Sequence, residues 1–238
     1  MSLRKDQHKL TIESINRRVV RCTRCPELRT YCAQVAAEKK LAYRDWTYWG
    51  KPVPSFGDPS AQVMLVGLAP GAHGSNRTGR PFTGDKSGGF LYPALFRAGF
   101  ASQPTAISRD DGLKLRNCLI TAAVRCAPPH NKPTPTELGN CAPYLAQEFG
   151  ALPRLQVIVA LGAIALRATL EMLRRSSFDI EPNRPEFRHG AECEALRGRR
   201  ALRVISSFHP SQQNTNTGKL TKAMFDRIFV RVNELLAL

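Results

Sequence analysis

Four short apolar runs constrain the fold of this chain more than any other feature. They lie at residues 63–67, 118–124, 157–161 and 202–206. A continuous run of this length is typical of a strand buried on both faces of a parallel sheet. Helical stretches lie between and after the runs, near 88–98, 135–149, 162–175 and 218–237. Strands that alternate with helices predict βαβ units with right-handed crossovers.

We therefore predict an α/β fold, a three-layer α/β/α sandwich around a central four-stranded parallel sheet. The length of 238 residues suits one sizeable core, so residues 1–238 are expected to form a single domain. Residues 1–60 would form an N-terminal extension, with one or two helices within 4–41 and a loop over 43–60. A proline at residue 26 would start a new helix there.

Polar and glycine-rich segments follow three of the four expected strands. They cover residues 67–89, 125–133 and 207–218. In an open parallel sheet, ligands bind beyond the carboxyl ends of the strands. The sequence therefore predicts one ligand site built from these three segments.

The first segment has seven glycines among its 23 residues, together with Arg77, Arg80 and Lys86. It lacks the GxxxxGK[ST] pattern of a P-loop and the register of a dinucleotide fingerprint. Exposed backbone N–H groups and basic side chains suit contacts with phosphates or bases. Asp85 is the lone carboxylate. It could be an N-cap for the next helix, a group that holds a water or stabilises a cationic sugar, or both. Phe82 fits a core position or a stacking surface.

The third segment begins with an imidazole, His209, close behind a strand. Most lone histidines are structural, but this position favours a functional role. Residues 212–218 carry amides and hydroxyls with little apolar content. They form either a disordered surface loop or a wedge that contacts a nucleic-acid strand.

The net charge of +16 points to a polyanionic partner, nucleic acid first and an anionic membrane surface second. A basic housekeeping protein, or one from a genome that favours arginine, is the alternative. No apolar run approaches the roughly 18 residues of a spanning helix, and the N-terminus has no apolar signal core. We expect a cytoplasmic protein in a reducing compartment.

Seven cysteines in a reducing compartment argue against a disulfide framework. Cys22 and Cys25 form a CxxC pair that could chelate a metal from one turn, or they could be a pair of surface thiols. Cys126 and Cys141 form a wider pair, with 14 residues between them. Zinc and a four-iron cluster both accept four cysteines, and spacing does not decide between them. The remaining thiols, Cys32, Cys118 and Cys193, are expected to be spare.

Three motifs, GLAPGAHGSNRTGRPFTGDKSG, VRCAPPHNKPTP and HPSQQNTNTG, closely resemble those of the family-five uracil-DNA glycosylases, the UDGb branch. The resemblance runs from about residue 20 to the C-terminus. It implies a structural [4Fe–4S] cluster held by Cys22, Cys25, Cys126 and Cys141. It also implies a monofunctional DNA repair enzyme that flips uracil out of duplex DNA, cleaves its N-glycosidic bond and leaves an abasic site.

The resemblance implies roles for particular residues. Asp85 matches the catalytic carboxylate, His209 the histidine that contacts the uracil carbonyl, and Phe82 the aromatic that stacks on the flipped base. The other substrate-binding positions would be Gly67, Leu68, Ala69, Gly71, His73 and Asn131.

Leu68 stands where better-known uracil glycosylases have a polar residue. We therefore expect a permissive pocket that also takes hypoxanthine or other damaged bases. We expect a monomer that binds double-stranded DNA at the nucleoid and has no membrane partner. The alternative from another class is a metal-bound nucleic-acid-binding protein without catalysis, which would need neither Asp85 nor His209.

Overall fold

The computed structural model describes residues 10–237. Its sheet has seven strands in the order β1-β3-β2-β4-β7-β6-β5. The strands are β1 (Phe56–Gly57), β2 (Val63–Gly67), β3 (Cys118–Ala122), β4 (Val157–Leu161), β5 (Asp179–Glu181), β6 (Glu192–Arg197) and β7 (Arg200–Ser207). The main helices are α1 (Ile12–Val20), α2 (Pro26–Glu38), α4 (Gly88–Arg97), α5 (Pro135–Ala151), α6 (Ala163–Arg175) and α8 (Lys222–Leu236). Shorter ones are η1 (Leu41–Tyr43), α3 (Ser75–Thr78), η2 (Pro129–Asn131) and α7 (Gln212–Asn216).

The four strands expected from the apolar runs are neighbours in the middle of this sheet. β3, β2, β4 and β7 pair in parallel, whereas β1, β6 and β5 pair antiparallel. The prediction of a four-stranded sheet was therefore wrong in strand number, because the sheet is mixed and has three further strands. β1 has only two residues, and β5 and β6 alternate charged with apolar residues. A search for continuous apolar runs misses both kinds of strand.

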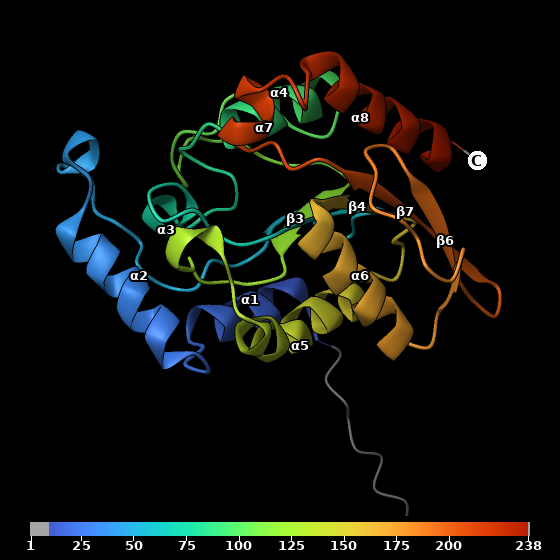
Figure 1. The fold of residues 1–238 in the computed structure, drawn as a ribbon, viewed down its shortest axis with the longest axis horizontal. Helices are drawn as coiled ribbons and strands as arrows, with labels where there is room; N and C mark the ends of the chain where they lie inside the picture. The colour runs from blue at the N-terminus through green and yellow to red at the C-terminus, as the bar shows by residue number, and fades with distance from the viewer. Residues whose placement is uncertain (1–9, 238) are drawn as a thin grey trace, which may run out of the picture.

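Helices cover both faces of the sheet, which gives the three layers that the sequence predicts (Figure 1). Alternate side chains of the strands enter two apolar clusters. One cluster joins Met64 and Ile158 to α5 and α6, and the other joins Leu65 and Val159 to α4 and α8. This division follows from the two-residue side-chain period of a strand. Burial on both faces explains why the runs contain no polar alternation.

The N-terminal helices join the body of the protein. α2 begins at Pro26, as expected from the fixed φ of proline at a first helical position. Ile15 and Val19 of α1 pack against Tyr144 of α5. Positions 4–9 of the expected N-terminal helices lie outside the described residues. Among residues 10–237, no helix is both long enough and apolar enough to span a bilayer.

Candidate active site

A cleft of about 940 Å³ opens at the carboxyl end of the sheet. Its floor includes Gly67 and Ala122, the last residues of β2 and β3, and His209, which follows β7. The cleft therefore lies at the edge where ligands bind in open parallel sheets. Every substrate-binding and catalytic position expected from the sequence lines this cleft: Gly67, Leu68, Ala69, Gly71, His73, Phe82, Asp85, Asn131 and His209.

Asp85 lies in the loop between β2 and α4, with its carboxylate enclosed by backbone. Oδ1 accepts a hydrogen bond from the N–H of Gly88 at 2.8 Å, so this side chain does help to begin α4. Oδ2 lies against Gly74, where a Cβ atom would come within 2.1 Å of it. Only glycine permits that approach. Asp85 thus makes a structural bond to the start of α4 and is also one of the residues that line the cleft.

Burial raises the pKa of Asp85 above the ordinary value for an aspartate. Hydrogen bonds from the backbone N–H groups of Gly88 and Ser87 and the charge of Arg77 oppose that rise. Desolvation disfavours a charged carboxylate, whereas donors and cations favour it. A carboxyl group perturbed in this way within a cleft is a candidate for catalysis.

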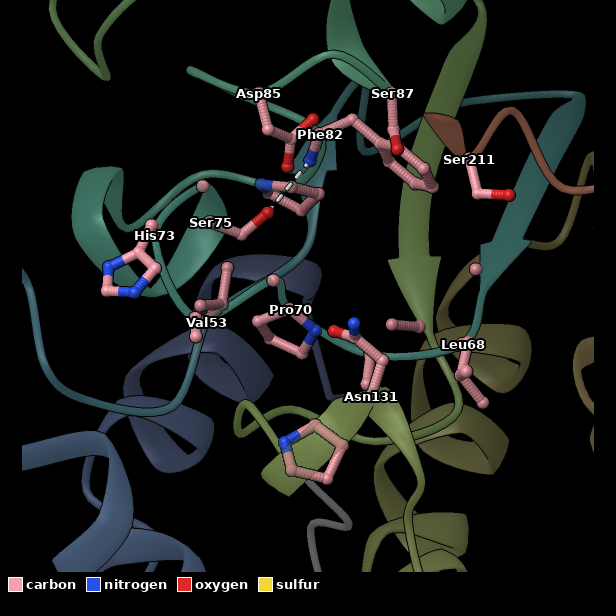
Figure 2. A pocket seen from close by; sticks show the side chains of 18 of the residues that line it. Val53, Leu68, Pro70, His73, Ser75, Phe82, Asp85, Ser87, Asn131 and Ser211 are labelled. Atoms are coloured by element: carbon pink, nitrogen blue, oxygen red, sulfur yellow. Dashed lines mark hydrogen bonds between the residues drawn. The ribbon is translucent and has the colours of Figure 1, made fainter. Parts of the chain in front are cut away.

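The rings of Phe82 and His209 pack against each other in the cleft that Asp85 also lines. Their ring centroids lie 5.7 Å apart, with 32° between the planes. The Phe82 ring also covers Gly67, because a Cβ atom there would lie 3.0 Å from Cζ of Phe82. Phe82 itself adopts a φ of +50°, and its N–H donates to Oγ of Ser75 at 3.0 Å (Figure 2). Phe82 therefore lines the cleft while its edge packs on the apolar layer below.

Burial lowers the pKa of His209 to about 4, so its imidazole is neutral at physiological pH. A neutral ring still has one N–H to donate. The backbone carbonyl of His209 accepts from the Asn214 amide at 2.8 Å, which ties the strand end to α7. Residues 212–216 are thus helical instead of a disordered loop, and Gln212 and Gln213 line the cleft.

His73 and Asn131 complete the wall. His73 Nδ1 shares a hydrogen bond with the Tyr48 hydroxyl at 3.1 Å, and burial lowers its pKa. Asn131 has a φ of +56°, in the left-handed region that asparagine tolerates better than most residues. Its amide points toward the segment that carries Leu68 and Pro70 (Figure 2).

Three residues support the site in ways that the sequence did not indicate, and one of them, Arg77, was expected to contact phosphates or bases but is buried. Ser75 accepts from Phe82, Tyr48 meets His73, and Arg77 lies among the charges that act on Asp85. Ser75 and Arg77 lie within the glycine-rich motif, but no spacing rule marks them. Tyr48 comes from the segment expected as loop, and only the fold brings it to the cleft.

The four cysteines expected to bind a cluster lie outside the cleft. Cys126 and Cys141 are buried, whereas Cys22 and Cys25 are half-buried between α1 and α2. Within residues 10–237, no three Cys, His, Asp or Glu side chains are arranged to hold a metal ion. The thiols are nonetheless near one another, since Cys25 and Cys22 both add to the rise in the pKa of Cys141 that burial causes.

Cys32 is closer to this group than its sequence position indicates. Its thiol contacts Cys126 and donates to the carbonyl of Ala127 at 3.6 Å. Cys25, Cys32, Cys126 and Cys141 share one small apolar cluster. Three of these are expected cluster ligands, whereas Cys22 packs against the neighbouring apolar cluster of α1 and Tyr144. Soft sulfur donors that are partly shielded from water suit iron–sulfur or zinc chemistry.

The chain belongs to the uracil DNA glycosylase superfamily, since the profile of that family matches residues 54–233. It is 49% identical to the Type-5 uracil-DNA glycosylase of Thermus thermophilus over 217 aligned residues, and the alignment covers 91% of this chain and 94% of that protein. It is 47% identical over 204 residues to the Type-5 uracil-DNA glycosylase of Pyrobaculum aerophilum, covering 86% and 84%.

A Type-4 uracil-DNA glycosylase of Archaeoglobus fulgidus is more distant, with 31% identity over 160 residues, or 67% of this chain and 70% of that protein. These similarities confirm the family resemblance that the three motifs indicate.

Proposed function

We propose that this protein is a monofunctional uracil-DNA glycosylase, which hydrolyses the N-glycosidic bond of uracil in duplex DNA and leaves an abasic site. One observation carries the proposal. A buried carboxylate, a neutral imidazole and an aromatic ring from two different strand ends line one cleft. The names of the Type-5 relatives agree with it.

The reaction requires base flipping, because the glycosidic bond is inaccessible in a stacked duplex. Extruding a nucleotide costs a few kcal/mol, and less for a mismatched base such as uracil opposite guanine. Phe82 offers its face to the extruded base, and stacking of this kind contributes about 1–3 kcal/mol per base. The +16 net charge would grip the phosphates and make binding salt-dependent without choosing the base.

Bond cleavage develops positive charge on the sugar and negative charge on the departing base. Asp85 as carboxylate would stabilise the sugar cation or orient the attacking water. Because its pKa is raised, activity should increase as pH rises through that pKa. His209 would donate from its neutral ring to the uracil oxygen that gains charge, and one such donor contributes about 3–4 kcal/mol.

The cleft also suggests the choice of base. Leu68 presents an apolar side chain where an amide reader would discriminate more strictly. We extend the proposal to hypoxanthine and other deaminated bases. We also propose that the protein acts as a monomer, and that an enzyme for genomic DNA works at the nucleoid in the cytoplasm.

The test is a duplex with one G·U pair, incubated with the protein and then heated in alkali. We expect no strand break before alkali and one at the uracil position after it, because the product is an abasic site. Asp85→Ala should lose most turnover but retain DNA binding. If no deaminated base is released from any such duplex, the protein is the non-catalytic nucleic-acid-binding protein instead.

We further propose that Cys22, Cys25, Cys126 and Cys141 hold a [4Fe–4S] cluster with a structural role, which joins α1, α2 and α5 to the segment after β3. Their closeness and their sulfur chemistry support it. The purified protein should be brown, and Cys126→Ser should reduce its iron content and thermal stability. The matched control Cys193→Ser, at a buried cysteine outside this cluster, should stay brown. A colourless, zinc-loaded and fully active preparation would refute the iron assignment.

A further inference from the structure

We propose that Arg77 is a positioning residue that fixes the loop carrying Asp85, and that the N-terminal extension holds Arg77 in turn. The inference rests on the proposed function, since it concerns the same carboxylate. Nothing in the sequence patterns assigns this arginine a role beyond general basic charge.

Two hydrogen bonds make Arg77 a clamp across the glycine-rich loop. Its side chain is only 3% exposed. Nε donates to the carbonyl of His73 at 2.8 Å, and Nη2 donates to the carbonyl of Gly84 at 2.6 Å. The two carbonyls lie on opposite sides of α3, and Gly84 directly precedes Asp85. Charge-assisted bonds of this kind are about twice as strong as neutral ones, so the backbone before Asp85 is tightly fixed.

Aromatic rings from the N-terminal extension hold the guanidinium. Its Cζ lies 3.9 Å from the ring centroid of Tyr43 and 4.1 Å from that of Trp46. A planar guanidinium stacks on aromatic faces, whereas a lysine ammonium cannot match both the stacking and the two directed bonds. Tyr43 and Trp46 precede residue 54, where the superfamily profile begins to match. A segment outside the matched region therefore supports the loop that carries the catalytic carboxylate.

Arg77 is also the cation that acts on Asp85. Burial raises the pKa of Asp85, and the positive charge of Arg77 lowers it. Tyr92 of α4 and Lys86 are further ionisable groups near Asp85, and the cleft is also lined by Arg125, His130, Tyr31 and Tyr43. Lys40, His73, Lys132 and His209 line the same cleft. Without Arg77, burial would be opposed only by the backbone donors, so Asp85 would stay protonated to a higher pH.

The test compares pH profiles of single-turnover uracil release for the wild type, Arg77→Gln and Arg77→Lys. In Arg77→Gln, the acidic limb of the profile, where the rate rises with pH, should move to higher pH by about one unit. At pH values below this limb the rate should be about tenfold lower than in the wild type, and the difference should disappear as pH rises. Arg77→Lys keeps the charge and should show a smaller shift. The control Arg80→Lys alters a buried arginine of the same loop that pairs with Asp111 at 2.7 Å, and should lower the melting temperature without moving the limb.

A second readout does not depend on turnover. The carboxyl ¹³C signal of Asp85, assigned with Asp85→Asn, should titrate at higher pH in Arg77→Gln than in the wild type. If Arg77→Gln does not fold, Tyr43→Leu should give a smaller shift in the same direction. An unchanged limb and an unchanged Asp85 titration would overturn the inference. An inactive wild type with a shifted titration would refute the proposed function and leave the clamp standing.

Discussion

Replacing Gly74 by alanine should remove most of the base-release activity while leaving the fold intact. The added Cβ atom would lie 2.1 Å from Oδ2, 2.8 Å from Cγ and 2.9 Å from Cβ of Asp85. All three distances are below 3.0 Å, so the whole side chain must move and not only its tip. The carboxylate would have to shift by more than about 1 Å, and a misplacement of that size costs about a hundredfold in rate.

The matched control is the same substitution at Gly89, 15 positions further along the chain. No heavy atom lies within 4 Å of a Cβ placed there, and Gly89 is in α4, where alanine is about 1 kcal/mol better than glycine. Single-turnover release from a G·U duplex should therefore be normal in Gly89→Ala and about a hundredfold slower in Gly74→Ala, with similar circular dichroism. A rate for Gly74→Ala within threefold of the wild type would show that the carboxylate is not needed where the structure has it.

Three further substitutions test other parts of the account. Burial lowers the pKa of His209 to about 4, so the stability that the neutral ring contributes is fully present above about pH 6.5 and is lost as pH falls toward 4. In urea unfolding, the free energy of unfolding of the wild type should therefore fall by about 2 kcal/mol more than that of His209→Gln between pH 7 and pH 5. Equal losses would contradict this. Glu148 is fully buried, pairs with Arg125 and accepts a hydrogen bond from the Thr121 hydroxyl at 2.6 Å. Glu148→Ala should therefore lower the free energy of unfolding by about 3–5 kcal/mol in the same assay. A loss below about 1 kcal/mol would count against a buried ion pair. Phe82→Ala should lower kcat/KM for uracil about 5- to 150-fold and leave binding of undamaged duplex unchanged. An unchanged kcat/KM would contradict the stacking role of Phe82.

The central layer of this fold could be predicted from sequence because burial on both faces leaves an unbroken apolar run. The carboxyl-end rule then brought Asp85 and His209 to one cleft, although 124 positions separate them in the chain. The hairpin of β5 and β6 could not be found in the same way, since one face is solvated and its charges break the run.

The contacts that hold the site residues in place could not be predicted from the sequence for a different reason. The stacking of Arg77 between Tyr43 and Trp46 depends on how the N-terminal extension folds back, which no local pattern records. The sequence already allowed Asp85 to be both a helix cap and a functional carboxylate, but its close approach to Gly74 is visible only in the structure. Cys32 had no expected partner, and its contact with Cys126 is again a product of the fold.

The most direct test is a structure of the Asp85→Asn variant with a duplex that contains one G·U pair. We expect an extruded uracil with its ring against Phe82, its carbonyl within hydrogen-bond distance of His209, and C1′ of its sugar next to residue 85. A uracil that remains stacked in the duplex, or one bound with its sugar away from residue 85, would contradict the central claim.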